Sequence, residues 1–182
     1  MQFDSRGLLF VAILLAGCSP EETPVEPPAP VATASTCGGS GYVSAQLSGA
    51  LTANIEWRDP DILCESMVRP GDRGVRLRFS GDVSDELLAI IIAMPTLEPG
   101  ATGTDFDAVV TVTVEGSGRF FSTPTLGSCW ADVSRNTPID VLSALYIVAG
   151  QLACVGPLGE FNGDAFVEIS DLRFSGIAKW EE

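Results

Sequence analysis

Apolar and polar side chains alternate along much of the chain, as they do in half-buried β-strands. Between residues 75 and 80, Val, Leu and Phe alternate with Arg, Arg and Ser, and a similar period recurs within 108–114. A period of two places the two kinds of side chain on opposite faces of a strand. Residues 87–94 are continuously apolar and follow residues that resemble a helix cap, but their isoleucine triplet favours a buried strand.

Segments of this kind follow one another, separated by turns that contain glycine. About ten short strands at this spacing predict an antiparallel β-sandwich, and a β-barrel is the alternative. One segment, 141–149, also fits a helix, although its Tyr-Ile-Val sequence favours a strand. The segments that we interpret as strands are 42–47, 51–57, 62–68, 75–80, 87–94, 108–114, 119–122, 128–133, 141–149, 151–155, 165–174 and 177–180.

Two short motifs add detail to this pattern. Asn-Gly at 162–163 predicts a tight hairpin turn, because both residue types tolerate a positive φ. The pentapeptide Leu-Arg-Phe-Ser-Gly occurs at 77–81 and again at 172–176. The residues that flank the two copies do not align, so we interpret the repeat as two strands that make the same corner rather than as a duplication.

A change of parity marks the last long segment. Val167 and Ile169 share one parity, whereas Leu172 and Phe174 share the other. Both pairs can face one core only if an extra residue lies between them. The pattern therefore predicts a β-bulge near residues 170–171.

The N-terminal residues have the organisation of an export signal. Arg6 supplies positive charge, and residues 8–16 form an unbroken apolar run. This run is too short to cross a bilayer, which needs about 20 residues. The sequence Leu15-Ala16-Gly17-Cys18 that ends it resembles the lipobox of bacterial lipoproteins.

By this resemblance, residues 1–17 are a signal peptide that is removed before Cys18. Cys18 then carries a thioether-linked diacylglycerol and usually an N-linked acyl chain such as palmitate, and two or more chains anchor a protein stably. Ser19 follows, rather than the Asp that favours inner-membrane retention in well-studied Gram-negative families. The resemblance implies a lipoprotein of the cell envelope that is anchored in the outer membrane and faces the periplasm or the cell surface.

The residues after the lipobox divide into a tether and a domain. Residues 18–36 comprise the lipidated cysteine and a segment rich in Pro and Glu. Such a segment has too little apolar surface to offset its ordering entropy, so we expect a disordered tether of at most about 3.1 Å per residue. Residues 37–182 have the length of one domain, and we expect them to form the β-sandwich.

Composition excludes several chemistries. The chain contains 24 acidic and 10 basic residues, for a net charge of −14, and no histidine. We expect no nucleic-acid ligand for such a chain, because phosphate contacts need clustered cations. The absence of histidine removes Ser-His-Asp and Cys-His catalysis, His-ligated zinc and His-based pH switching. With Lys179 as its single lysine, Schiff-base chemistry is not expected either, and we expect no cofactor.

Four cysteines belong to the predicted domain, namely Cys37, Cys64, Cys129 and Cys154, and none lies in a Cys-x-x-Cys motif. An even number in an exported chain predicts two disulfides. Three connectivities can be written. We favour Cys37–Cys64 with Cys129–Cys154, because each bond then joins neighbouring cysteines and closes a modest loop.

A local group of basic residues offers one candidate site. Arg69, Arg73, Arg76 and Arg78 account for much of the positive charge in the domain. The planar guanidinium suits carboxylates and phosphates, so the group fits docking to an anionic envelope component or an acidic partner. The alternative, which we favour, is internal pairing with the many carboxylates of the domain.

Acidic residues offer two further candidates. The pairs Asp59/Asp61 and Asp105/Asp107 have the spacing of some calcium loops, but neither extends to a full calcium-binding motif. We therefore interpret them as solvated turn residues and expect no metal. Two carboxylates at a suitable separation also hydrolyse glycosidic bonds without histidine, so a hydrolase of envelope glycans is an alternative function.

Aromatic residues provide the last candidate. Phe120 and Phe121 are adjacent in an expected strand, so they should point to opposite faces. Trp57, Trp130 and Trp180 fit a sugar-binding platform, because aromatic faces stack on apolar ligand surfaces. The alternative, which we favour for each of them, is packing in the core or at its rim.

No motif in the predicted domain identifies a molecular function. Disulfides, the absence of histidine and the absence of a nucleophile motif favour binding or structure over catalysis. We therefore expect a non-enzymatic binding or interaction module, attached to the membrane by its lipid and contacting envelope protein or glycan. A carboxylate-dependent hydrolase and a purely structural envelope component are the alternatives.

Overall fold

Eleven β-strands and no helix make up the part of the chain described by the computed structural model, which comprises residues 36–67, 73–140, 142 and 144–180. All pairings between these strands are antiparallel. The strands are β1 (Tyr42–Gly49), β2 (Ala53–Arg58), β3 (Leu63–Met67), β4 (Val75–Val83), β5 (Glu86–Met94), β6 (Gly103–Val114), β7 (Arg119–Ser122), β8 (Cys129–Asp140), β9 (Leu145–Cys154), β10 (Leu158–Glu160) and β11 (Phe166–Lys179).

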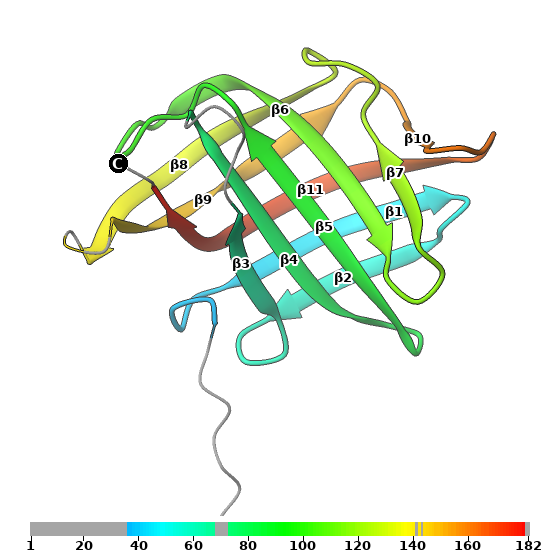
Figure 1. Ribbon diagram of the computed structural model, residues 1–182, viewed down its shortest axis with the longest axis horizontal. Coiled ribbons are helices and arrows are strands. Elements are labelled where there is room, and N and C mark those ends of the chain that lie inside the picture. Colours follow the sequence, from blue (N-terminus) through cyan, green and yellow to red (C-terminus); the bar gives the residue numbers. More distant parts are fainter. Residues whose placement is uncertain (1–35, 68–72, 141, 143, 181–182) are drawn as a thin grey trace, which may run out of the picture. The chain divides into compact units, whose positions relative to one another are not determined.

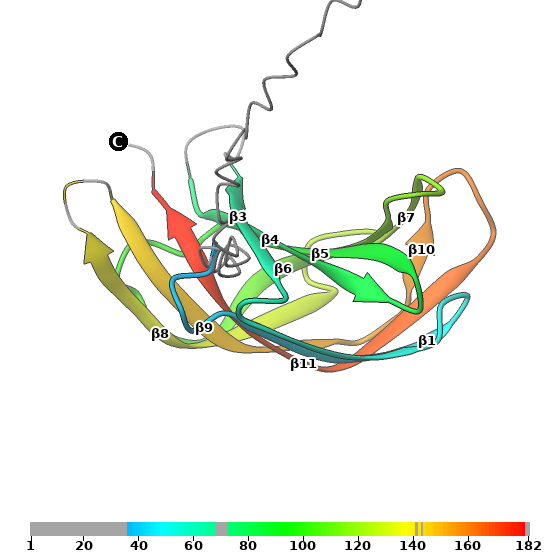
Figure 2. The same cartoon turned by 90° about the horizontal axis from the view of Figure 1, so that it is seen from below.

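The strands form a sandwich-like arrangement of two layers (Figures 1 and 2). Hydrogen bonding follows the order β2-β1-β11-β10-β7-β6-β5-β4-β3, and β8 and β9 form a branch between β6 and β11. The layer that contains β1, β9 and β11 curves beneath β3, β4 and β5 (Figure 2), and β3 and β4 contact β11 across the interior. The predicted antiparallel β-sandwich is therefore confirmed in preference to a barrel.

The hydrophobic core lies between the two layers, where the alternating pattern of the sequence places it. Val75, Leu77 and Phe79 are each exposed by 2% or less. Phe79 from β4 meets Phe174 from β11, with 6.3 Å between ring centroids. The continuously apolar segment is the central strand β5, which pairs with β4 on one side and β6 on the other. Leu88, Ile90 and Ile92 share one buried face, whereas the other face carries the small buried Ala89 and Ala93 with half-buried Ile91 between them, so its burial does not alternate.

The repeated pentapeptide occupies matching positions in the two layers. One copy lies in β4 and the other in β11, and the leucine, phenylalanine, serine and glycine of both are buried. A Cβ atom on Gly176 would lie 2.5 Å from the ring of Phe79, and one on Gly81 would lie 2.7 Å from the indole of Trp57. An aromatic ring of the core thus packs directly against each glycine. This close packing explains why both copies of the repeat end in glycine.

The two disulfides have the predicted connectivity. Cys37–Cys64 joins the segment before β1 to the edge strand β3 across 27 residues. Cys129–Cys154 joins two residues that lie directly opposite each other in β8 and β9. One bond thus connects the two layers, and the other fastens the ends of a single strand pair.

Two local predictions are also confirmed. A hairpin connection joins β10 and β11 at the Asn-Gly pair, with a φ of 62° at Asn162, although Gly163 does not share the positive φ. In β11 the register against β1 shifts between Ser170 and Arg173, and Asp171 has a φ of 51°. This β-bulge lets the apolar residues on both sides of it face the same core.

The structure corrects several predicted strand boundaries. Residues 141–149 and 151–155 were expected as separate elements but form one strand, β9, and β11 likewise runs through glycine to Lys179. The glycines are not turns. A Cβ on Gly150 would lie 2.2 Å from the carbonyl oxygen of Asp132 in β8, where the register between β8 and β9 shifts. The short strand β10 was not predicted.

Candidate functional site

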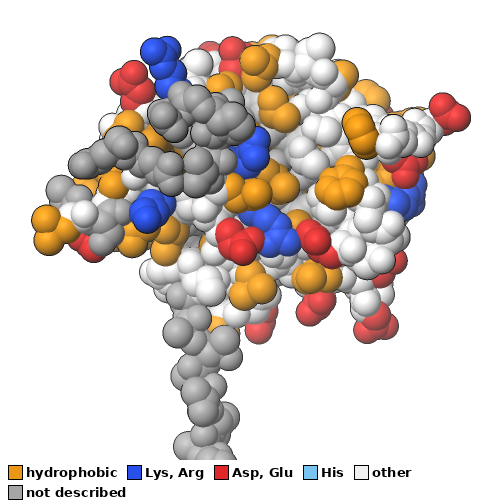
Figure 3. Space-filling view, viewed as in Figure 1, with side chains coloured by type: hydrophobic (Ala, Val, Ile, Leu, Met, Phe, Trp, Pro, Cys, Tyr) orange, Lys and Arg blue, Asp and Glu red, His pale blue; other side chains and the backbone are white. Residues whose placement is uncertain are grey.

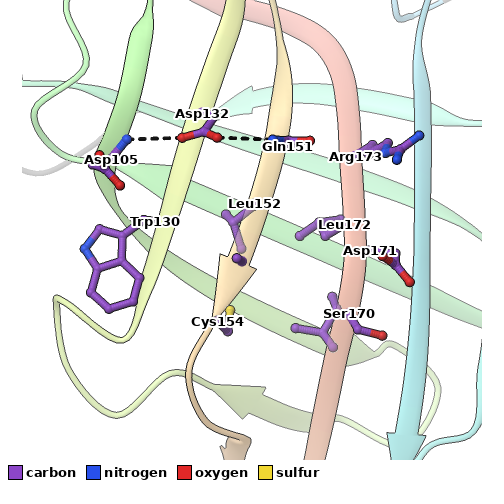
Figure 4. A pocket seen from close by; sticks show the side chains of 12 residues that line it. Asp105, Trp130, Asp132, Gln151, Leu152, Cys154, Ser170, Asp171, Leu172 and Arg173 are labelled. Atoms are coloured by element: carbon purple, nitrogen blue, oxygen red, sulfur yellow. Dashed lines mark hydrogen bonds between the residues drawn. The ribbon is translucent and has the colours of Figure 1, made fainter.

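A groove of about 460 Å³ lies on the outer face of the layer that contains β8, β9 and β11 (Figure 4). It follows the line along which β9 and β11 separate, because their pairing ends at Leu172↔Leu152. Buried Leu152, Ile169 and Leu172 contribute apolar surface to the groove. Its polar and aromatic lining consists of Asp105, Trp130, Asp132, Gln151, Ser170, Asp171 and Arg173.

Strand register brings these side chains together. Asp132, Gln151 and Arg173 are successive partners across β8, β9 and β11. Trp130 lies two residues before Asp132 in β8 and opposite Ala153. Since residues two apart share a face of a strand, Trp130 and Asp132 both point away from the core. Cys129, Ala131 and Val133 between and beside them are buried.

Hydrogen bonds hold the carboxylate of Asp132 in one orientation (Figure 4). Gln151 donates from Nε2 to Asp132 Oδ2 over 3.1 Å, and the backbone N–H of Asp105 donates to Asp132 Oδ1 over 3.2 Å. Asp105 has a φ of 60°, in a part of β6 where its register against β8 shifts. The irregular backbone of β6 thus places a backbone N–H donor at the groove.

Other polar groups of the groove have no partner. Among the residues that the structure describes, the Arg173 guanidinium, the Asp171 carboxylate, the Ser170 hydroxyl and the Trp130 Nε1–H make no side-chain hydrogen bond or ion pair. The bulge at Asp171 places Asp171 and Arg173 on the exposed side of β11. The groove therefore presents donors and acceptors that a ligand can engage.

The arginines of the opposite layer contrast with Arg173. Arg78 contacts Glu65 and, over 2.8 Å, Glu115, and basic and acidic side chains lie next to one another on that face (Figure 3). Burial lowers the pKa of Arg78, but the hydrogen bonds and charges of the two glutamates outweigh this effect and raise it. The guanidinium of Arg78 is therefore already engaged with carboxylates.

The remaining members of the predicted arginine group are less closely associated. Arg76 lies two residues from Arg78 on the same outward face of β4. Arg73 is exposed before β4 and lines a second hollow with Trp180. Arg69 lies outside the described residues. The sequence grouping therefore corresponds, within the described chain, to Arg78 paired with two glutamates, Arg76 beside it on β4, and Arg73 before the strand.

A further ion pair lies at the edge of the same layer. Arg119 Nε donates to Glu160 over 2.6 Å, and the Arg119 guanidinium carbon lies 4.9 Å from the ring centroid of Phe121. The hydrogen bond from Arg119 lowers the pKa of Glu160 and raises that of Arg119. This pair joins β7 to β10, so the two charged groups are already engaged with each other.

The predicted aromatic residues separate into buried and exposed groups. Phe121 is fully buried and Phe120 is 46% exposed, as expected for neighbours in a strand. Trp57 and Trp180 are buried, at 7% and 8% exposed, and Trp57 donates to the carbonyl oxygen of Asp82. A platform of three tryptophans is therefore wrong, and Trp130 is the one that lines the groove.

The predicted acidic pairs have separate roles. Asp59 Oδ2 accepts a hydrogen bond from the backbone N–H of Gly41 over 2.7 Å, a contact that fastens the turn after β2. Asp105 lines the groove, and its partner Asp107 lies opposite Trp130. Within the described residues, no three or more Cys, Asp or Glu side chains converge in a way that would hold a metal ion.

The predicted membrane anchor cannot be placed on this structure. Cys18, the signal peptide and all but the last residue of the tether lie outside the described residues. Within the described part of the chain, no helix has the length and apolar character that a membrane span requires. Lipid attachment therefore stays a prediction from the lipobox.

Comparison with known proteins finds no relative of this chain. No protein family model, no curated protein and no solved structure matches the chain. The groove must therefore be interpreted from its own residues. Sequence analysis identified Trp130 and Asp105 as candidates but missed Asp132, Gln151, Asp171 and Arg173. The parity change in β11 was the available signal, because β-bulges often lie beside functional sites and redirect side chains.

Proposed function

We propose that this protein is a lipid-anchored lipoprotein of the bacterial cell envelope, attached to the outer membrane, whose β-sandwich domain is a non-enzymatic binding module. The lipobox supports the anchor, and the groove between β9 and β11 supports binding. A tethered domain with one polar and aromatic groove fits the capture of a ligand near the membrane to which it is attached.

The observation that carries the binding proposal is the groove itself, which has Trp130 on one side and the groups of Asp171 and Arg173 on the other (Figure 4). Arg78 and Arg119 are paired with glutamates. Arg173 is exposed and, like Arg76, makes no ion pair within the described residues, although Asp171 lies two residues away on the same strand. Its guanidinium is therefore open to a ligand that enters the groove.

The geometry favours binding over catalysis. Hydrolysis by carboxylates needs one acid that protonates the leaving group and a second that acts as a base or nucleophile. Both carboxylate oxygens of Asp132 accept hydrogen bonds, from Gln151 and from the backbone of Asp105. Asp132 is thus fixed as an oriented acceptor, a role that suits recognition of ligand hydroxyl or amide groups.

Lipid attachment is tested by metabolic labelling with an alkyne analogue of palmitate in cells that express the full chain. We expect label in the wild type and in Ser19→Ala, and only background label in Cys18→Ala, because the lipobox cysteine carries the acyl groups. Label that persists in Cys18→Ala would refute the anchor. The neighbouring Ser19→Ala variant controls for a general disturbance of export.

Binding through the groove is tested by crosslinking in intact cells. A photoreactive phenylalanine derivative is placed at Ala153, which is exposed and lines the groove, and in a second variant at Phe120 on the opposite layer. We expect discrete adducts from position 153 and none of comparable yield from position 120. Mass spectrometry of the adduct then identifies it as protein or glycan. No adduct at 153, or equal adducts at both positions, would contradict a binding role for the groove.

A further inference from the structure

The geometry points to a neutral saccharide as the ligand of the groove, with a pyranose ring stacked on Trp130 and hydroxyl groups held by Asp132 and Arg173. This inference rests on the proposed binding function and adds the chemical class of the ligand. It follows from three properties of the groove, namely its aromatic surface, its arrangement of donors and acceptors, and its charge.

The aromatic surface is supplied by Trp130. It is the one tryptophan of the described chain that is not buried, and it lies at the groove, opposite Ala153 on the neighbouring strand. A half-buried indole offers part of an apolar face together with an N–H donor. A pyranose has the matching surface, with C–H groups on one face and hydroxyl groups around its rim.

Donors and acceptors are placed along one row of the layer. Asp132, Gln151 and Arg173 are direct neighbours across three strands, so their backbones span about 10 Å at the usual strand spacing. Asp132 accepts hydrogen bonds and Arg173 donates them. A sugar hydroxyl does both, so hydroxyls on two linked sugar units can engage the two ends of the row.

The charge of the groove argues against an anionic ligand. The groove contains three carboxylates, from Asp105, Asp132 and Asp171, and one guanidinium, from Arg173, within a chain of net charge −14. Polyanions such as nucleic acid or an anionic polysaccharide would be repelled. A cationic peptide would not be repelled, but it has no surface that matches both the indole and the row of hydrogen-bonding groups. A neutral saccharide is not repelled and has both surfaces.

The size of the groove agrees with this ligand. Its volume of about 460 Å³ lies in the range of roughly 300–1,000 Å³ that is usual for small-molecule sites. Apolar floor and polar rim are also the usual composition of such sites. Here Leu152, Ile169 and Leu172 supply the floor, and the row from Asp132 to Arg173 supplies the rim.

The experiment is a titration of the full-length lipoprotein in detergent with defined oligosaccharides, monitored by tryptophan fluorescence. Neutral probes are the tetramers of N-acetylglucosamine, of β-1,4-linked glucose and of α-1,4-linked glucose, and the anionic probe is tetragalacturonate. Because Trp57 and Trp180 are buried, a ligand that stacks in the groove changes mainly the emission of Trp130. We expect at least one neutral tetramer to bind and tetragalacturonate to bind at least about tenfold more weakly.

Substitutions in the groove test whether the saccharide binds there. Trp130→Ala and Arg173→Ala should each raise the dissociation constant about tenfold or more, which corresponds to the loss of one stacking or charge-assisted contact. Isothermal titration calorimetry measures these variants, since Trp130→Ala lacks the reporter. Trp130→Phe should retain part of the affinity. The double variant Phe120→Ala/Arg76→Ala removes an aromatic residue and an arginine from the opposite layer and should bind like the wild type.

Three outcomes would overturn the inference. These are binding of tetragalacturonate in preference to every neutral tetramer, absence of binding to all four probes, and equal affinity in Trp130→Ala and the wild type. If a protein adduct forms at position 153 while no saccharide binds, the groove is a binding site for protein, and only the saccharide class fails. If position 153 gives no adduct at all, the proposed function itself fails.

Discussion

Replacing Phe121 with Ala is expected to lower the free energy of unfolding by about 3–5 kcal/mol. Phe121 is fully buried in β7, where it lies opposite Val112 and Glu160. The substitution removes an aromatic ring from the interior, so the protein loses its transfer free energy and keeps a cavity that the surrounding strands only partly fill. Urea unfolding of purified protein, monitored by fluorescence, measures the change.

The neighbouring residue provides a matched control. Phe120→Ala removes the same side chain from the same strand, but Phe120 is 46% exposed. We expect its effect to stay below about 1 kcal/mol, as for most surface substitutions. Similar losses at both positions would mean that the faces of β7 are assigned wrongly, and a negligible loss at Phe121 would refute its burial in the core.

Removal of the disulfides is expected to have the second large effect. The bonds close segments of 27 and 25 residues, and loops of this length correspond to about 3.5 kcal/mol each in the chain-entropy description. Cys37→Ala/Cys64→Ala and Cys129→Ala/Cys154→Ala should therefore each lower the free energy of unfolding by about 3–4 kcal/mol. Small proteins are usually stable by about 5–15 kcal/mol in total, so the variant that lacks both bonds should lose about half or more of its stability and show a much lower urea midpoint.

Reduction provides the control for this prediction. Dithiothreitol should shift the urea midpoint of the wild type toward that of the quadruple variant and should leave the quadruple variant unchanged. Peptide mapping without reductant should recover two linked pairs, one containing residues 37 and 64 and the other containing residues 129 and 154. An unchanged midpoint after complete reduction would show that the bonds do not stabilise the domain.

Several features of the fold were readable from local sequence. Period-two alternation predicted β4, and the Asn-Gly pair predicted the turn that precedes β11. The parity change in β11 predicted its bulge, because a strand that buries both parities must contain an extra residue. The disulfide connectivity followed from the number and spacing of the cysteines. Each of these signals depends on residues that are close together in the chain.

Most errors in the predicted strand boundaries involve glycine. A glycine that forms a turn and a glycine that makes room for a packed neighbour look the same in a sequence. Gly150 and Gly176 were interpreted as breaks between strands, yet both lie within long strands. Because Gly150 has no side chain, the backbone of β8 packs directly against it, and the ring of Phe79 from the opposite layer packs against Gly176 in the same way. The partner in each case is distant in sequence, so no local pattern distinguishes such a glycine from a turn.

In the candidate site, too, some residues were visible in the sequence and others were identified only from the tertiary structure. Trp130 was visible as a candidate, but nothing in the sequence relates it to Gln151 or to Arg173. Those residues become neighbours because β8, β9 and β11 pair in one register and because a bulge at Asp171 keeps Arg173 on the exposed side of β11. The arginine group at 69–78 was conspicuous in sequence, whereas its best-defined member, Arg78, is paired with glutamates.

The sequence by itself determined the all-β class of this protein, its two disulfides and the chemistries that the lack of histidine removes, and it contains the lipobox on which the proposed anchor depends. These properties follow from composition and from the period of neighbouring side chains. Only the tertiary structure decided that β9 and β11 separate to leave a groove and that Arg173 lacks a carboxylate while Arg78 has two. Strand register sets both, and register arises from the packing of all the strands around one core rather than from any single segment.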